Sequence, residues 1–190
     1  MTNIEIAGQI ISIAAMATTI FSYQQKKQLH LVICQLIGGT LFAVSFFLLG
    51  ATVGALLNLV ASIRAVLFLF SKKLHATHPA WLYGFIACYI VLYVLAFTAF
   101  GVEPTVINMI VELLPVIGMT ALSIGFMRED SAAVRRWGFV SSPAWLVYNI
   151  YYLSIGAIIC ETISIVSIIV GVLRHDRKKS TDNPTENTQQ

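Results

Sequence analysis

Seven apolar windows, each about as long as a membrane-spanning helix of roughly 20 residues, follow one another along the chain. Short stretches that carry charge, Pro or Gly separate them. The windows predict an all-α integral membrane protein with seven transmembrane helices. They lie at 4–23, 30–49, 52–71, 80–100, 105–126, 136–153 and 156–173.

The composition agrees with a surface that faces lipid. Hydrophobic residues make up 57% of the chain and charged residues only 11%, whereas soluble domains average about 25% charged residues. A water-facing surface with so little charge would expose large apolar patches. The cysteines Cys34, Cys88 and Cys160 lie within the apolar windows, so we interpret them as small hydrophobic side chains rather than a disulfide framework.

Basic residues predict the orientation, because cytoplasmic loops of membrane proteins are enriched in Lys and Arg. Of the 12 basic residues, all but Arg64 follow the first, third, fifth and seventh windows, on one side of the predicted membrane. The other side carries Glu5 and Glu103. We therefore expect a multi-pass protein with a periplasmic N-terminus, a cytoplasmic C-terminus and a disordered polar tail at 176–190.

An internal repeat is suggested by sliding the sequence by 103 residues, which lays the first three windows over the last three and Met16 over Met119. Within the third window of each triple a slide of 102 pairs Gly54 with Gly156, which predicts a one-residue difference at the preceding turn. Three spans reverse the chain, so the fourth window is needed to restore the orientation. The pattern predicts two parallel three-helix repeats joined by a linker helix (3+1+3).

The repeat also predicts the domain organisation. Parallel repeats related by an axis along the membrane normal occur in transporters, where the substrate site lies between the halves. At the level of the fold, the plan resembles the sugar-transporting SWEET and PQ-loop proteins. The predicted parts are a first repeat at 1–73, a linker helix at 74–103, a second repeat at 104–175 and the tail at 176–190.

Five polar side chains lie inside the windows, roughly 8–12 Å from the outer helix ends at about 1.5 Å per residue. A charged side chain at such depth costs about 2.5 kcal/mol or more, so each needs a reason. In the repeat arrangement they would converge between the triples, as a site for a small polar ligand or as a structural network between helices. The five are Gln9, Asn58, Glu112, Asn149 and Glu161.

Arg64 lies deep inside the third window, about 9 Å closer to the cytoplasm than Asn58 at 1.5 Å per residue. Two interpretations stay open for it. The guanidinium can pair with Glu112 or Glu161 in the interior, or the long side chain can extend to the inner headgroups. Only the first interpretation makes Arg64 part of the polar site.

Aromatic residues and prolines add candidates in the second half. Trp145 and Tyr148 share a helix face beside Asn149, a grouping that could stack against a sugar or a similar polar ring, or simply pack in the core. Pro115 and Pro143 interrupt the backbone hydrogen bonds of their helices, which is tolerated beside neighbouring helices or a water-lined cavity. We predict helix hinges there. The first half has Ser12 and Thr40 at the corresponding positions. SWEET-type transporters carry prolines in both halves, so the absence of prolines at these two positions argues against a symmetric rocking mechanism.

Several short segments carry a family resemblance. The first half contains Gln24-Gln25-Lys26-Lys27, Leu48-Leu49-Gly50-Ala51 and Gly54-Ala55, and the second half contains Glu112-Leu113-Leu114-Pro115-Val116-Ile117-Gly118, Trp145-Leu146-Val147-Tyr148-Asn149 and Ser154-Ile155-Gly156. These segments resemble the bacterial inner-membrane YgjV family over nearly the whole chain except the tail. The resemblance implies a location in the bacterial cytoplasmic membrane and no particular substrate.

Two functions remain open at this stage. The first is a transporter of a small polar solute, sugar-like or another metabolite, with proton coupling if a buried carboxylate titrates. The second is a membrane scaffold, lipid-binding protein or sensor that does not transport. We expect neither an enzyme nor a cofactor, and His75 and His78 lack the further ligands of a metal site. Nucleic-acid binding has no support, and a homodimer is left open.

Overall fold

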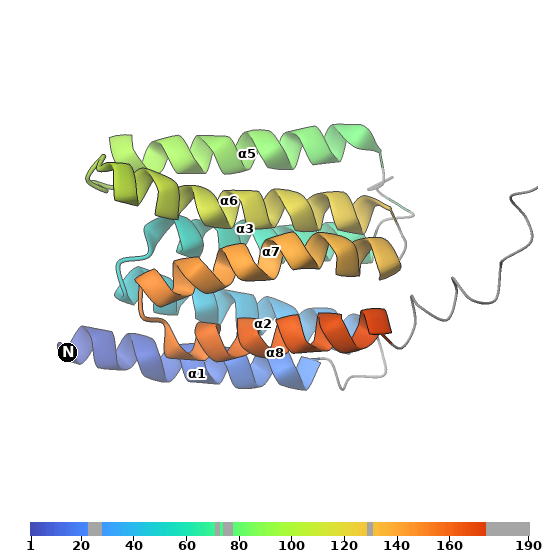
Figure 1. Ribbon diagram of the computed structural model, residues 1–190, viewed down its shortest axis with the longest axis horizontal. Coiled ribbons are helices and arrows are strands. Elements are labelled where there is room, and N and C mark those ends of the chain that lie inside the picture. Colours follow the sequence, from blue (N-terminus) through green and yellow to red (C-terminus); the bar gives the residue numbers. More distant parts are fainter. Residues whose placement is uncertain (23–27, 71–72, 74–77, 129–130, 174–190) are drawn as a thin grey trace, which may run out of the picture.

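The computed structural model describes residues 1–22, 28–70, 73, 78–128 and 131–173. The predicted tail at 176–190 lies outside this part. Every secondary-structure element in the described residues is a helix (Figure 1), which confirms the all-α fold class. The helices are α1 (Asn3–Ser22), α2 (Gln28–Leu48), α3 (Thr52–Leu69), α5 (Pro79–Thr98), α6 (Val106–Met127), α7 (Ser131–Tyr151) and α8 (Ile155–Gly171).

The helix bounds agree with the predicted windows except at the start of α7. This helix begins at Ser131, whereas the prediction began at 136 and left Arg135 in a loop. Hydropathy reports only the apolar part of a helix, and a polar first turn can extend beyond it. Both arginines before Trp137 therefore belong to the first two turns of α7.

The described helices differ in how clearly they are suited to cross a membrane. By length and composition, three qualify: Asn3–Phe21, Pro79–Thr98 and Val106–Gly125. The apolar parts of three others are shorter, at Leu36–Leu48, Thr52–Leu67 and Ile155–Val170. α7 is more polar, because serines, arginines and an asparagine interrupt its apolar residues.

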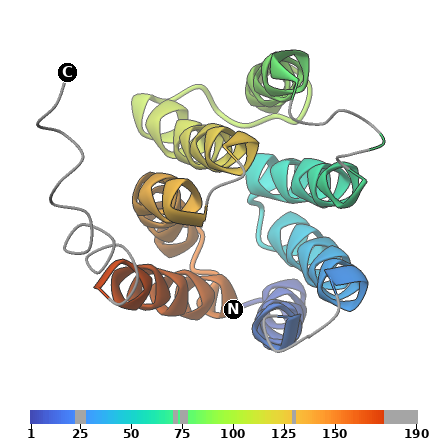
Figure 2. The same cartoon turned by 90° about the vertical axis from the view of Figure 1, so that its right-hand side faces the viewer.

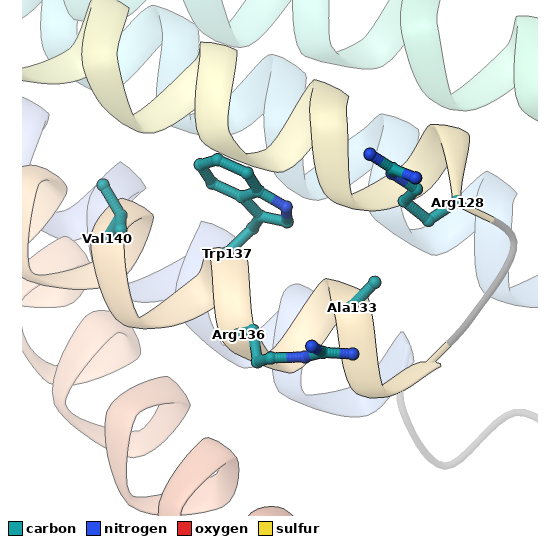
Figure 3. Close-up of a pocket in the computed structure, with 5 residues that line it drawn as sticks. All are labelled: Arg128, Ala133, Arg136, Trp137 and Val140. Atoms are coloured by element: carbon teal, nitrogen blue, oxygen red, sulfur yellow. The ribbon is translucent and has the colours of Figure 1, made fainter. Parts of the chain in front are cut away.

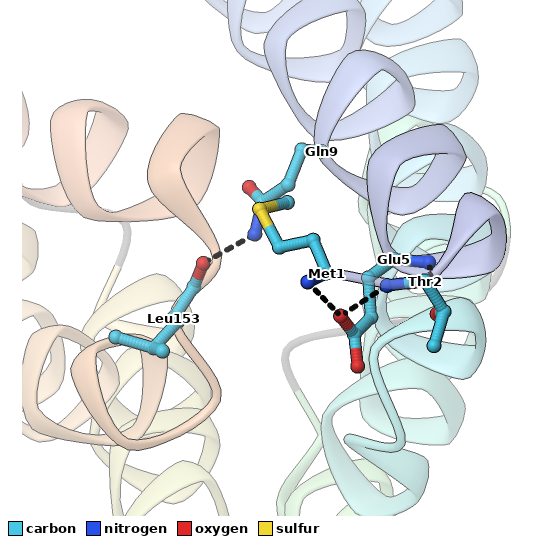
Figure 4. Close-up of polar contacts among 5 residues, drawn as sticks. All are labelled: Met1, Thr2, Glu5, Gln9 and Leu153. Atoms are coloured by element: carbon cyan, nitrogen blue, oxygen red, sulfur yellow. Dashed lines mark hydrogen bonds and ion pairs between the residues drawn. The ribbon is translucent and has the colours of Figure 1, made fainter.

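The N-terminus of α1 is capped by the side chains of Thr2 and Glu5 (Figure 4). The backbone N–H of Glu5 donates to Thr2 Oγ1 at 3.2 Å, and the N–H of Thr2 donates to Glu5 Oε2 at 2.9 Å. This reciprocal pair is a capping box, which satisfies N–H groups that have no partner within a first helical turn. The terminal amine of Met1 lies 3.9 Å from the same carboxylate.

Six of the helices form a closed ring, and α5 lies outside it (Figure 2). Around the ring, α1 contacts α2, α2 contacts α3, α3 contacts α6, α6 contacts α7, α7 contacts α8, and α8 contacts α1. α5 packs against α3 and α6. Two seams thus join α1–α3 to α6–α8: the α3/α6 seam and the α1/α8 seam. A two-fold rotation that exchanged the triples would exchange the seams, but the repeat itself stays a prediction.

The turns that precede α3 and α8 have the same construction. After α2, the N–H of Gly50 bonds to the carbonyl of Phe47 and that of Ala51 to Phe46. After α7, Leu153 bonds to Ile150 and Ser154 to Asn149 in the same way. Both are Schellman motifs, with a residue of positive φ, Gly50 at 77° and Leu153 at 52°, just past the helix end. The turns are equal in length, so the predicted one-residue difference between them is wrong.

Candidate binding site

A carboxyl group is buried where α6, α7 and the start of α3 meet. Glu112 of α6 is fully buried, and the hydroxyl of Tyr152, just after α7, donates to its Oε1. The Tyr148 hydroxyl accepts from the N–H of Gly54 at 2.8 Å and lies near the same carboxyl group. Gly54 is the third residue of α3, and N–H groups in a first turn have no partner within the helix.

Glycine at position 54 is required by this contact. A Cβ there would lie 2.5 Å from Cε1 and 2.9 Å from the hydroxyl oxygen of Tyr148. The absent side chain lets the phenol oxygen reach the backbone of α3. The positive end of the α3 dipole therefore faces the Tyr148 hydroxyl, with the carboxyl group of Glu112 behind it.

Two buried side-chain oxygen atoms, one on α6 and one on α7, have no hydrogen-bond partner among the described residues. They are Oε2 of Glu112 and Oδ1 of Asn149, and both side chains are almost completely inaccessible, at 0% and 1% exposure. An unsatisfied buried acceptor costs about 1–3 kcal/mol. Each such group in a native fold therefore needs an explanation.

An aromatic wall lies beside the carboxyl group. Trp145 is stacked with Phe46 of α2, with ring centroids 6.2 Å apart, and meets Tyr148 edge-on at 5.8 Å. Its indole covers Gly118 of α6, where a Cβ would lie 2.8 Å from Cδ1. These contacts place Trp145 in the core, and they fix the ring of Tyr148 in front of Gly54.

The α1/α8 seam carries a separate polar cluster with neutral side chains. Gln9 donates from Nε2 to the carbonyl of Leu153 at 2.5 Å (Figure 4) and accepts from the N–H of Ile155 at 3.0 Å. The Ser12 hydroxyl lies 2.9 Å from the Ser154 hydroxyl and accepts from the N–H of Ala157 at 3.2 Å. The start of α8 is thus capped from α1.

Arg64 lies in a third cluster, at the α3/α6 seam and α5. Its side chain is only 5% exposed, and Nη1 donates to Ser123 at 2.8 Å, to the carbonyl of Met119 at 3.3 Å and to Tyr89 at 3.4 Å. No ion pair joins it to Glu112 or Glu161 among the described residues. The guanidinium is instead held by hydroxyls and a carbonyl in the interior, which neither sequence interpretation included.

The remaining polar candidates make local contacts. Asn58 donates to the carbonyl of Gly54 in its own helix at 2.9 Å. Glu161 of α8 lies within hydrogen-bonding reach of the Ser142 hydroxyl on α7. The predicted polar layer is therefore divided among several clusters instead of converging on one axis.

The two prolines lie inside continuous helices. Pro115 is in α6 and is buried, and Pro143 is in α7 and is exposed. Each removes one backbone N–H from its helix. Pro115 is three residues after Glu112, so the carbonyl of Val111 that it leaves without its helical donor is next to the buried carboxyl group. A hinge at either position stays a prediction.

The sequence missed the hydroxyl groups that complete these clusters. Tyr152 looked like a tyrosine of the outer membrane edge, yet it follows Tyr148 by four residues and its N–H bonds to the Tyr148 carbonyl, so both side chains continue one face at the end of α7. Ser154 and Ser123 gave no signal, because serine is common in membrane helices and only a neighbouring helix identifies its partner. Tyr89 could have been suspected as the hydroxyl nearest the middle of its window.

Apolar helices that enclose charged and polar side chains define an integral membrane protein. Residues 6–179 match the profile of the Imp-YgjV family, described as bacterial inner membrane protein, and the chain therefore belongs to this family. The match confirms the family predicted from the short segments and gives the protein a place in the bacterial inner membrane. No curated protein and no solved structure matches the chain.

Proposed function

We propose that this protein spans the inner membrane several times and transports a small polar solute that binds at Glu112. The observation that carries the proposal is the pair of buried acceptors without partners, Glu112 Oε2 and Asn149 Oδ1. Because both are acceptors, a suitable ligand is rich in donors. A polyhydroxylated or amine-bearing metabolite has this chemistry.

The expected topology has the N-terminus in the periplasm and the C-terminus in the cytoplasm. α1, α3, α6 and α8 run in the same direction, and α2, α5 and α7 run in the other (Figure 1). Lys73 after α3, Arg128 after α6 and Arg136 in the first turns of α7 therefore lie at the end of the bundle where α8 ends. Positive charge favours the cytoplasmic side.

The seams supply the means for a conformational change. Near the outer ends, the triples are joined by Gln9 and Ser12 at α8 and by Tyr148 at Gly54. Further toward the inner end they are joined by Arg64 at Ser123. A transporter opens its two ends alternately, and each of these contacts is a small set of hydrogen bonds that can be exchanged for contacts with water or solute.

The first test is the melting temperature of the purified protein in detergent with a panel of polyols, sugars, amines, amino acids and organic acids. A ligand that binds only the folded state stabilises it by about 2.7 kcal/mol at 100 times its Kd. We expect a concentration-dependent rise with a donor-rich compound, lost in Glu112→Gln. That compound should then enter proteoliposomes that contain the protein.

Glu161→Gln provides the matched control, because it makes the same change in another cluster and should keep the thermal shift. Loss in Glu161→Gln alone would move the site to α8. A panel without any shift, together with unreactive cysteines placed at Asn58 and Asn149 in a cysteine-free background, would contradict the transport proposal and favour a sealed structural network.

A further inference from the structure

A pocket of about 670 Å³ opens between the end of α6 and the beginning of α7 (Figure 3). Its volume is within the range of about 300–1,000 Å³ that is typical of ligand sites. It lies at the opposite end of α6 from Glu112 and is independent of that site. Its lining residues are Arg128, Ala133, Arg136, Trp137 and Val140.

The lining changes from charged to apolar between Arg136 and Val140 of α7. Arg128 and Arg136 supply two guanidinium groups near the end of the bundle, and both side chains are exposed. Trp137 stands between α7 and α6 (Figure 3), and Val140, 44% exposed, continues the wall toward the middle of the helix. From Ala133 to Val140 the helix rises about 10 Å at 1.5 Å per residue.

We propose that this pocket binds the headgroup of an anionic phospholipid of the inner leaflet. Arginine pairs well with phosphate, because its planar fork can donate two parallel hydrogen bonds. Basic pockets between helices on the cytoplasmic side are suited to such headgroups, and tryptophan prefers this level of the membrane. The inference rests on the multi-pass arrangement proposed above, and not on transport.

The apolar part of the lining distinguishes a lipid from a soluble anion. A free phosphate would use only the guanidinium groups and would leave Trp137 and Val140 without a role. A phospholipid places its phosphate at the arginines and the beginning of its acyl chains along the indole and the valine. From Arg136 through Trp137 to Val140, the order of the lining residues along α7 matches the order of these groups in a lipid.

The test compares the protein in phosphatidylcholine nanodiscs with and without phosphatidylglycerol or cardiolipin, with lipid retention measured by native mass spectrometry. At the energy expected per basic residue near an anionic surface, each arginine should contribute about fivefold in affinity. The double variant Arg128→Gln/Arg136→Gln should therefore lose roughly 25-fold, by the same reasoning. Lys73→Gln, an exposed basic residue at the same end outside the lining, should retain lipid nearly as wild type does.

A second variant keeps the charges and fills the apolar wall. Val140→Trp should also lower retention of anionic lipid, and it tests the pocket even where the double arginine variant fails to fold. An unchanged Val140→Trp would overturn the proposal, as would an equal loss in Lys73→Gln, which would mean diffuse attraction. Stabilisation by inorganic phosphate in phosphatidylcholine alone would assign the pocket to a soluble anion. Solute binding at Glu112 should persist in both pocket variants.

Discussion

The first turns of α3 and α8 are capped in different ways, although the turns before them are built alike. At α8 the third N–H, that of Ala157, donates to Ser12, and a glutamine and a serine close the rest of the cluster. At α3 the third N–H, that of Gly54, donates to Tyr148. Behind that hydroxyl lies the carboxyl group of Glu112.

The difference between the two caps lies in their charge and in how completely their polar groups are hydrogen-bonded. The α8 cap is neutral, and the polar groups that the structure assigns to it find partners. The α3 cap contains an ionisable group with one oxygen atom that has no partner. A structural requirement alone would be met by the first arrangement, and the ligand proposed at Glu112 would supply the partner that the second one lacks.

The largest effect on stability should come from Gly156→Ala in α8. A Cβ at position 156 would lie 2.3 Å from the carbonyl oxygen of Ser12 and 2.5 Å from its hydroxyl oxygen. A backbone cannot move aside as a side-chain tip can, so α1 and α8 must separate. Overpacking costs about 1–3 kcal/mol, and we expect the upper part of this range, measured by unfolding in detergent.

Gly54→Ala is the matched control at the other seam. There the obstacle is the buried Tyr148 ring, whose displacement would also strain its hydrogen bond with the N–H of Gly54. We expect a cost within the overpacking range of about 1–3 kcal/mol and below that of Gly156→Ala, because a ring can shift where a backbone cannot. The caps would differ less than the contacts indicate if both glycine variants lost the same stability.

The next largest effect should come from Tyr148→Phe. The ring and its contacts with Trp145 are kept, but the buried N–H of Gly54 loses its acceptor, which costs about 1–3 kcal/mol. Ligand binding should weaken as well, because the phenol orients the carboxyl group. Tyr151→Phe, which removes an exposed hydroxyl bonded to Asn108, should leave both stability and binding nearly unchanged. Equal behaviour of the two variants would remove Tyr148 from the site.

The sequence predicted the helices and their bounds well, because the apolar windows report directly which segments can lie in lipid. It also singled out the polar residues in these windows, of which Gln9, Glu112 and Asn149 are buried, whereas Asn58 and Glu161 are half-buried. It could not predict their partners. Whether Gln9 meets Glu112 or the start of α8 depends on the rotation of α1 about its axis, which apolar residues on all sides of a membrane helix do not determine.

Arg64 illustrates the same limit. Sequence reasoning looked for a carboxylate of opposite charge, whereas the described contacts are with Ser123, Met119 and Tyr89. Tyr89 comes from α5, the helix expected to act as a linker. Neither spacing nor charge within a window indicates that a neighbouring helix supplies an uncharged acceptor.

The smallest effects should come from exchanging Gln9 of α1 and Glu112 of α6, which a slide of 103 residues lays over each other. Gln9→Glu replaces an amide that donates to the carbonyl of Leu153 with a group that repels it, and we expect a loss of about 1 kcal/mol, as for a lost hydrogen bond. Glu112→Gln keeps the shape and an acceptor for Tyr152, and it removes the cost of burying a carboxyl group. Its stability without ligand should change by less than about 1 kcal/mol in either direction.

Melting temperatures of the two single variants and of the double exchange would measure this difference in stability. A Glu112→Gln protein much less stable than Gln9→Glu would mean that the carboxyl group holds the helices together, and the reason for binding at the α3 cap would disappear.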